Sequence, residues 1–340
     1  VRAYPLDGGP ATAWPLPAGP GADSDPGAIA VDLLGNIYVG YYSNANGRVE
    51  KYDVDALVAG VPLATWTGAV PELCGGACPF DRVTDLTLDS QGYLYLVDAM
   101  NRVVKLDPAN HADHALLSFG SFGENPGQFT GAEDVALDVD GTIYVTDYLL
   151  ARVQKFTQKL GGGVDYISSW QATGTRPGQF NRPVDIAVKN DDVYVTDSAN
   201  DRVQRFKWDG TFVQPYKTVD GRAFDDPWSI DFDAAGRLLV SEQVGTDLVN
   251  FNTTGDGLAL RDAGGGQAGY RKSVCVDSRG YSYAADFITG SVVKLDAAGT
   301  HIDSWGSFTQ PGSIACDGKG YVYITDEPGN ADGRISKYTT

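Results

Sequence analysis

The sequence predicts an all-β protein, and three observations carry this prediction. The 340-residue chain holds 42 Gly, 17 Pro and 18 Tyr, a composition that favours short strands and tight turns. No segment shows a long apolar period of 3.6 residues, so helices should be few. One short apolar segment recurs seven times, at spacings that suit four-stranded blades. Together they predict a single β-propeller of four-stranded antiparallel blades, seven in number, with six as the alternative.

The recurring segment is expected to form the first strand of each blade. Its copies end in an acid or a lysine and fall 57, 49, 51, 44, 44 and 40 residues apart, counted between their last positions. These periods are too long for leucine-rich or ankyrin units. The copies are residues 28–32, 85–89, 134–138, 185–189, 229–233, 273–277 and 313–317.

Further short strands follow each copy in the same order. A Gly-containing turn leads to a second strand centred on Tyr, at 37–39, 94–96, 143–145, 193–195, 238–240, 282–284 and 322–324. An alternating third strand comes next, as at 102–106, 152–156 and 202–206. A more variable fourth strand is expected at 62–66, 115–119, 166–170, 212–216, 258–261 and 301–305. Short alternating strands joined by turns form antiparallel sheets.

Side-chain sizes support a radial packing of these sheets. The middle residues of the first strands are mostly small: Ala30, Thr87, Ala136, Ala187, Asp231, Cys275 and Ala315. The middle residues of the second strands are mostly Tyr: Tyr38, Tyr95, Tyr144, Tyr194, Leu239, Tyr283 and Tyr323. Blades around an axis nearly touch at the centre and diverge outward, so small groups fit inside and Tyr fills the wider gap. We therefore interpret the Tyr series as core.

The two chain ends are expected to complete one blade together. The seventh repeat ends with its third strand at 334–338, and residues 11–16 resemble the missing fourth strand. Pairing them would close the ring and hide a sheet edge. The sequence thus divides into a Pro-rich N-terminal segment, 1–26, which includes the ring-closing strand, and the propeller, 27–340.

Residues 126–138 and 177–188 carry the most regular form of the repeat. In both, Pro-Gly-Gln-Phe leads into the first strand, the second strand ends in Tyr-Val-Thr-Asp, and Arg-Val-Gln follows. This pattern resembles the NHL-repeat family of β-propellers over nearly the whole chain. The family often has six blades, which keeps six as the alternative. Three repeats depart from the pattern: Gly40 and Glu242 replace the strand-end Asp, and Ser291 replaces the Arg.

An acid and an arginine flank the same hairpin in four repeats. A carboxylate at such a turn can accept N–H bonds and pair with the arginine across the hairpin. Since an active site is not normally copied in every blade, we interpret these pairs as structural. They are Asp98/Arg102, Asp147/Arg152, Asp197/Arg202 and Asp326/Arg334.

The charge excludes one class of partner. Lys and Arg total 26 and Asp and Glu total 44, which gives a net charge of −18. Such a surface repels phosphate backbones, so we expect no nucleic-acid binding. No apolar run approaches the ~18–20 residues of a membrane helix, so no membrane span is expected.

Cysteines and the chain start bear on the compartment. Cys74 and Cys78 flank a Gly-rich loop that can close a small disulfide, with two free thiols as the alternative. Cys275 and Cys316 lie in apolar strands and are expected to be buried packing thiols. The chain begins at Val1. With the acidic surface, these features favour an extracytoplasmic or secreted protein, and they allow it to be part of a larger polypeptide or surface assembly.

Candidate site residues gather at one predicted face. Loops into the first strands share a face with the hairpins between strands two and three, around the channel mouth, and such loops usually carry binding. Asp85, Asp134 and Asp185, at equivalent places in neighbouring blades, could offer oxygen ligands to Ca²⁺ or hold a cationic ligand. Alternatively, each caps its own strand entry through nearby backbone N–H groups. The expected ligand contacts are Tyr41, Tyr42, Glu133, Tyr148, Trp228 and Phe287.

No catalytic set is recognisable in the sequence. The three histidines, His111, His114 and His301, fall in places that do not converge. The sequence therefore favours a binding or scaffold module that contacts a protein, peptide or glycan through the mouth face, with Ca²⁺ as the one candidate cofactor. Because some NHL-like propellers are lyases or lactonases, the resemblance implies an alternative, a metal-assisted lyase or lactone hydrolase that uses the acidic mouth.

Overall fold

A computed structural model describes most of the chain. The described residues are 12–15, 25–42, 47–53, 62–68, 80–109, 115–160, 162–219, 222–233, 236–243, 247–252, 261–262, 271–326 and 333–339. Within them the regular secondary structure is β-strand, apart from one 3₁₀ turn, η1 (Ser198–Asn200). No helix in this part has the length and apolar character that crossing a membrane would need.

The described strands form seven four-stranded antiparallel sheets, one for each recurring segment. We number these sheets blades 1 to 7 in chain order. Blades 1 to 3 are β2 (Asp25–Val31), β3 (Asn36–Tyr42), β4 (Val49–Asp53), β5 (Ala64–Trp66); β6 (Val83–Leu88), β7 (Leu94–Asp98), β8 (Arg102–Leu106), β9 (Leu117–Phe119); and β10 (Ala132–Leu137), β11 (Ile143–Asp147), β12 (Arg152–Gln158), β13 (Val164–Gln171).

Blades 4 to 7 follow the same order, with a small extra hairpin between blades 4 and 5. They are β14 (Pro183–Lys189), β15 (Asp192–Asp197), β16 (Arg202–Lys207), β17 (Phe212–Tyr216); β20 (Pro227–Phe232), β21 (Arg237–Glu242), β22 (Asp247–Asn252), β23 (Arg261–Asp262); β24 (Arg271–Val276), β25 (Ser282–Asp286), β26 (Ser291–Leu295), β27 (His301–Trp305); and β28 (Pro311–Cys316), β29 (Tyr321–Asp326), β30 (Arg334–Thr339) with β1 (Thr12–Pro15). The extra hairpin is β18 (Thr218–Val219) with β19 (Arg222–Ala223).

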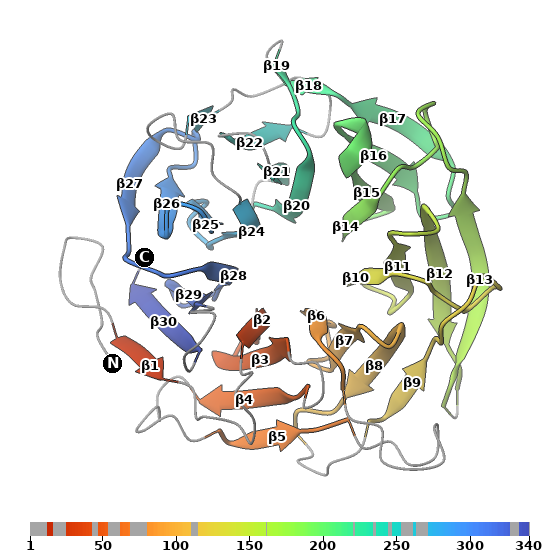
Figure 1. Ribbon diagram of the computed structural model, residues 1–340, viewed down its shortest axis with the longest axis horizontal. Coiled ribbons are helices and arrows are strands. Elements are labelled where there is room, and N and C mark those ends of the chain that lie inside the picture. Colours follow the sequence, from red (N-terminus) through yellow and green to blue (C-terminus); the bar gives the residue numbers. More distant parts are fainter. Residues whose placement is uncertain are drawn as a thin grey trace.

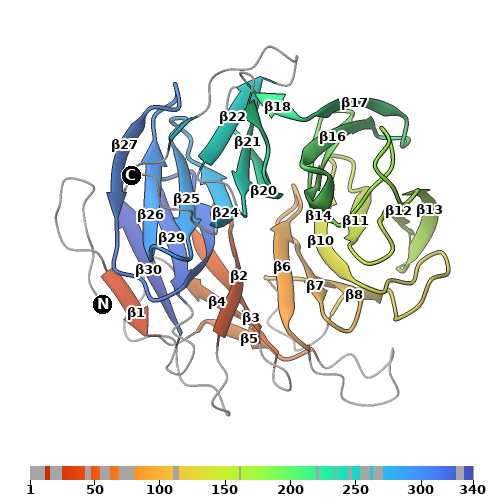
Figure 2. The same ribbon diagram turned by 45° about the horizontal axis from the view of Figure 1, so that its top comes forward.

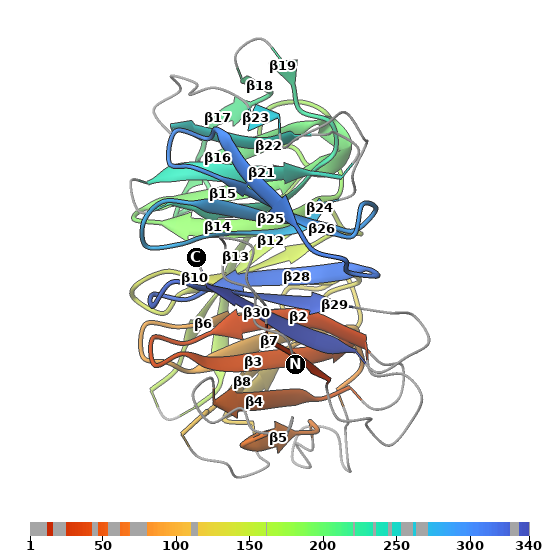
Figure 3. The same cartoon turned by 90° about the vertical axis from the view of Figure 1, so that its left-hand side faces the viewer.

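The sheets stand around a central channel, with the first strand of every blade innermost (Figure 1). Seen edge-on, the strands run across the thickness of a disc (Figure 3). We call the side where the first strands begin the mouth face, and the side of the turns between first and second strands the opposite face. The prediction of an all-β propeller of four-stranded antiparallel sheets is confirmed.

The N-terminal strand completes blade 7. β1 pairs antiparallel with β30, in a register that runs from Thr12 opposite Lys337 to Pro15 opposite Arg334. Figure 2 shows β1 lying beside β30 at the outer edge of the ring. The sequence prediction of a ring-closing strand at 11–16 is met by this pairing.

The Tyr series is core, and polar contacts fix several of its phenol rings. All seven middle residues of the second strands are buried, including Tyr323. The Tyr323 hydroxyl donates to Asp317 Oδ2 at 2.9 Å, and Asp317 Oδ1 accepts the Tyr321 backbone N–H at 2.8 Å. Lys337 Nζ lies 5.8 Å from the Tyr323 ring centroid. The acid that ends the first strand therefore fixes both the turn and the buried phenol, and related sets recur in other blades.

Every first strand changes register near the mouth face. A bulge leaves backbone N–H and C=O groups without partners in the strand ladder. The hydroxyl of the Thr in Tyr-Val-Thr-Asp is the hydrogen-bond partner of these groups. Thr196 Oγ1 accepts the Asp185 N–H at 2.8 Å and lies 3.2 Å from the Trp228 carbonyl of the next blade. Thr146 makes the same two contacts, to Asp134 N at 3.1 Å and Val184 O at 2.8 Å. The hydroxyl thus satisfies the bulge and joins two blades.

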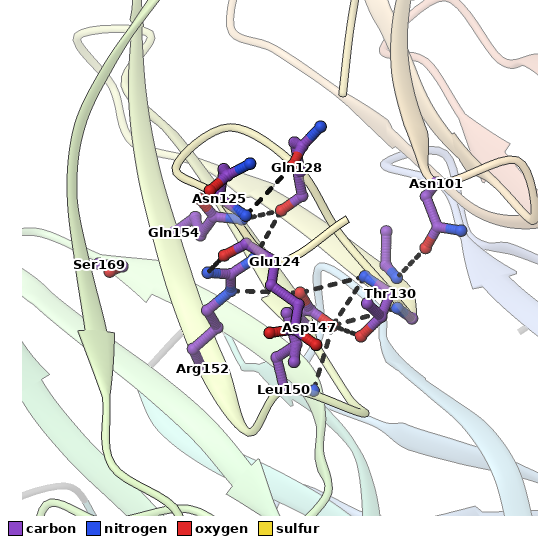
Figure 4. Close-up of polar contacts among 12 residues, drawn as sticks. Asn101, Glu124, Asn125, Gln128, Thr130, Asp147, Leu150, Arg152, Gln154 and Ser169 are labelled. Carbon is purple, nitrogen blue, oxygen red and sulfur yellow. Dashed lines mark hydrogen bonds and ion pairs between the residues drawn. The ribbon is translucent and has the colours of Figure 1, made fainter. Parts of the chain in front are cut away.

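The paired Asp and Arg residues have the structural role that the sequence predicted. Arg152 Nε donates to Asp147 at 3.2 Å, and its other nitrogens donate to the Glu124 and Gln128 carbonyls (Figure 4). Gln154 also binds the Gln128 carbonyl, at 2.6 Å. Arg-Val-Gln therefore holds the Pro-Gly-Gln-Phe loop that leads into the same blade. The other three pairs are also ion pairs.

Blade 1 departs from this pattern, and the structure corrects one sequence alignment. Gly40 lies opposite Val49, which puts Tyr41 at the strand-end position that Asp147 occupies in blade 3. The carboxylate comes instead from Glu50, which binds Arg48 Nε at 2.7 Å and the Tyr41 hydroxyl at 2.5 Å. Blade 1 thus has Tyr41 where blade 3 has Asp147. The missing carboxylate is supplied by Glu50, which stands where blade 3 has Gln154.

The prediction for Cys275 and Cys316 is wrong. They form a disulfide with a Cα–Cα distance of 5.7 Å, across 41 residues of sequence, between β24 and β28. Their strands are the innermost ones of adjacent blades, where backbones approach closely enough for such a bond. Cys74 and Cys78 lie outside the described residues.

Candidate functional site

The central channel contains a cavity of about 680 Å³. First strands from all seven blades line it, and its wall includes Tyr42, Glu133 and Trp228 near the mouth face. The carboxyl groups of Asp85, Asp134, Asp185 and Asp231 also belong to the wall, which among its described lining residues includes no Lys, Arg or His. The volume lies in the range of about 300–1,000 Å³ that ligand pockets occupy.

The three predicted aspartates come together, but they bind the neighbouring blade. Asp134 Oδ2 accepts the Ile186 N–H of blade 4 at 2.7 Å, and Asp185 Oδ2 accepts the Ile230 N–H of blade 5 at 3.0 Å. Asp85 Oδ2 lies 3.4 Å from Val135 N of blade 3. These carboxylates therefore link each of blades 2, 3 and 4 to the next blade by a hydrogen bond along the channel wall. Asp134 also caps its own strand, through the Val135 N–H at 2.8 Å, and Asp85 accepts the N–H of Leu86 in its own strand.

These carboxyl groups influence one another's ionisation. The charge of Asp85 acts on Asp134, and the charge of Asp134 acts on Asp185. Burial raises the pKa of Asp85 to about 6, and burial with the neighbouring carboxylates raises the pKa values of Asp134 and Asp185 well above their usual range. Burial also raises the pKa of Glu133 to about 7. The wall is consequently part-protonated near neutral pH.

Two aromatic residues of the predicted set form bridges between blades at the rim. The Arg82 guanidinium lies 5.5 Å from the Tyr42 ring, and that of Arg182 lies 5.0 Å from the Tyr148 ring. Arg182 Nε also donates to the Tyr148 hydroxyl at 2.5 Å. Both pairs join a second-strand end to the entry of the next blade, so the same contact occurs between blades 1 and 2 and between blades 3 and 4.

The remaining predicted contacts divide into two groups. Trp228 lines the cavity, at the start of β20. Phe287 occupies the hairpin after β25, equivalent to Tyr148, and it does not belong to the cavity wall. Tyr41 is fully buried in blade 1, with 0% of its surface exposed, so the prediction that it faces a ligand is corrected.

Sequence reasoning missed several groups at the channel. Asp231 Oδ2 accepts the Val276 N–H of blade 6 at 3.2 Å, and burial raises its pKa to about 7. Its signal was a carboxylate at a position where the other repeats carry small, uncharged residues. The two rim arginines precede the first strand in repeats 2 and 4, a spacing that the alignment of repeats could have shown.

The described part of the chain offers no group of three His, Cys, Asp or Glu side chains suited to a metal ion. Its one histidine, His301, is exposed on β27 at the outer edge of blade 6, while His111 and His114 lie outside the described residues. The aspartate oxygens at the channel already accept backbone N–H bonds.

Comparisons with known proteins agree with the fold. Residues 180–206, which span β14 to β16 of blade 4, match the family model described as NHL repeat. A search of the curated proteins found no significant match. The chain is similar to the crystal structure of virginiamycin B lyase from Staphylococcus aureus, with a TM-score of 0.72 and 14% identity over 97% of this chain and 99% of that one.

Two further structures show the same likeness. A catalytically inactive variant of the Staphylococcus aureus lyase with quinupristin gives a TM-score of 0.68 at 14% identity, over 97% of this chain and 99% of that one. A streptogramin B lyase gives 0.71 at 15% identity, over 96% of each chain. At these identities the likeness concerns the fold. The chain is thus a β-propeller that carries an NHL repeat.

Proposed function

We propose that this protein is an extracytoplasmic binding or scaffold module whose mouth face contacts a peptide, protein or glycan. The cavity carries the proposal, because it joins a suitable volume to two aromatic side chains, Tyr42 and Trp228, and an acidic wall. Aromatic faces pack well on apolar and sugar surfaces and offer polar edges for hydrogen bonds. The disulfide between Cys275 and Cys316 supports an oxidising compartment.

The charge of the cavity wall restricts the kinds of ligand that the cavity can accept. Five carboxyl groups line the cavity, and two arginines at the rim, Arg82 and Arg182, lie against tyrosine rings. An anionic group entering the channel would meet like charge, whereas a neutral sugar or a basic side chain would not. We therefore expect a neutral glycan or a peptide that carries Lys or Arg.

Two tryptophans allow a matched test. Trp228 lines the cavity, while Trp208 lies in the turn after β16 on the opposite face and is 53% exposed. Purified protein would be screened on arrays of glycans and of Lys- or Arg-containing peptides, and the selected ligand titrated against Trp228→Ala and Trp208→Ala. We expect Trp228→Ala to weaken binding at least about tenfold and Trp208→Ala to leave it unchanged. Equal losses, or no saturable ligand in either array, would remove the proposal.

The likeness to streptogramin lyases supports a second candidate, a metal-assisted lyase or lactone hydrolase that works at the channel. Mass spectrometry of quinupristin incubated with the protein and each of several divalent ions, including Ca²⁺, tests it. Metal analysis of the purified protein and of Asp134→Ala tests the aspartates as ligands. A bound ion that Asp134→Ala loses, together with turnover, would favour the enzyme; absence of both favours the module.

A further inference from the structure

One interface between blades contains a covalent bond in addition to its apolar packing. Cys275 of β24 and Cys316 of β28 join the innermost strands of blades 6 and 7. Cys275 is buried, whereas Cys316 is partly exposed and lies one residue before the turn acid Asp317. The bond therefore sits near the opposite face, within reach of a small reductant.

The preceding interfaces are held by groups that do not respond to reduction. Carboxylates bind the next blade's backbone from blade 2 through blade 6, ending with Asp231 on Val276. Between blades 6 and 7 the equivalent hydrogen bond comes from a neutral hydroxyl, with Ser273 Oγ 3.2 Å from Ile314 N. The disulfide adds to this weaker contact, at the position where Asp231 serves the interface before it.

Blade 7 is also the blade assembled from both chain ends. Its strands β28 to β30 come from the C-terminal part, and β1 joins them through pairing with β30 alone among the described strands. A shift of blade 7 therefore disturbs the strand that closes the ring.

We propose that the Cys275–Cys316 disulfide is a redox-dependent lock on blade 7. Its reduction loosens blade 7 together with β1 and leaves blades 3 and 4 closed. The step needs a dithiol as reductant. One thiolate of the dithiol attacks the Cys316 sulfur, the S–S bond breaks, and Cys275 leaves as a thiolate that takes up a proton. The second thiol then displaces Cys316 as a thiol, and the reductant ends as a cyclic disulfide.

Hydrogen–deuterium exchange on the full chain tests the lock. The variants are Cys275→Ser/Cys316→Ser and, as the matched control, Cys74→Ser/Cys78→Ser. We expect exchange in β28, β30 and β1 to accelerate by about tenfold or more in the first variant, with β10 to β16 within about twofold of wild type. The control should match wild type, and a dithiol should accelerate blade 7 in it as in wild type.

Two results would overturn the lock. One is unchanged exchange in blade 7 of the first variant. The other is equal acceleration in blades 3, 4 and 7, which would make the bond a general stabiliser. If the serine variant does not fold, wild type reduced by the dithiol and alkylated with iodoacetamide replaces it, and peptide masses show whether Cys275 and Cys316 carry the label.

Discussion

At the residue scale, the acids of the channel wall differ from the acids of the surface. Asp134 and Asp185 accept backbone N–H bonds from the next blade, and burial with neighbouring carboxylates raises their pKa values. Sequence spacing placed them at equivalent sites but could not show which backbone they reach, because that depends on how far one blade is rotated from the next. The repeats thus predicted the gathering of acids and missed its role between blades.

The raised pKa values predict how stability depends on pH. Asp85, Asp231 and Glu133 have pKa values of about 6, 7 and 7 in the folded protein, above their values of 3.8, 3.8 and 4.5 when unperturbed. The folded state therefore binds more protons than the unfolded state, and stability falls as pH rises from about 4 to about 7. Thermal melts across this range measure the slope.

Replacing a channel aspartate by asparagine removes the titrating carboxyl group, while the amide oxygen can still accept the backbone N–H bond. We expect Asp134→Asn/Asp185→Asn to flatten the fall of Tm with pH, whereas the exposed Asp140→Asn on the opposite face should keep the wild-type slope. A double variant with the wild-type slope would show that these two carboxyl groups do not have raised pKa values in the folded protein.

The hairpin arginines predict a graded loss of stability. Arg202 is 0% exposed, pairs with Asp197 and donates to three loop carbonyls, whereas Arg334 pairs with Asp326 but is 38% exposed. Removing a buried partner leaves a charge uncompensated, at a cost of about 3–5 kcal/mol, while an exposed pair contributes about 1 kcal/mol or less. Urea unfolding of Arg202→Ala and Arg334→Ala should show that order, and equal losses would contradict it.

At the scale of elements, the first strands combine a short apolar run with a bulge at the mouth. The run itself was readable from the recurring segment, and the small and Tyr positions were read correctly. The bulge could not be predicted, because no residue of the first strand indicates it. The side chain that satisfies the bulge, the Thr of Tyr-Val-Thr-Asp, lies on the second strand. Blade 1 shows most clearly how far the repeat pattern can be trusted. Tyr41 occupies the position of an Asp there, and this exchange is recognised only once the structure places Glu50 on the neighbouring strand beside it.

The bulge hydroxyls predict a stability effect that a methyl group cannot replace. Thr196→Val keeps the side-chain shape but leaves the Asp185 N–H and the Trp228 carbonyl without their partner. A buried unsatisfied group costs about 1–3 kcal/mol. Urea unfolding should show a loss of this size, and Thr211→Val, in the turn after β16, should show less than half of it.

At the scale of the whole molecule, closure depends on segments far apart in sequence. The ring-closing strand was predictable because the last repeat lacked one strand and an apolar segment stood at the other end. The disulfide was not predictable from the chain, since Cys275 and Cys316 meet only once blades 6 and 7 stand side by side. Both closures concern blade 7.

Removing the N-terminal strand should expose an edge. A chain that begins at residue 17 leaves β30 without its partner β1. Unpaired edges invite pairing with other chains, so we expect a lower Tm and association that grows with protein concentration. Light scattering and thermal melts check this, and a truncated chain that stays monomeric with an unchanged Tm would show that β1 does not close the ring.

The central claim is that ligands meet this propeller at the mouth face. Hydrogen–deuterium exchange with and without the array-selected ligand tests it most directly. With ligand bound, we predict slower exchange at the entries of the inner strands, in residues 81–85, 130–134 and 226–229. Exchange at the turns of the opposite face, 138–142 and 207–211, should not change. Protection confined to those turns or to the outer strands would contradict the claim.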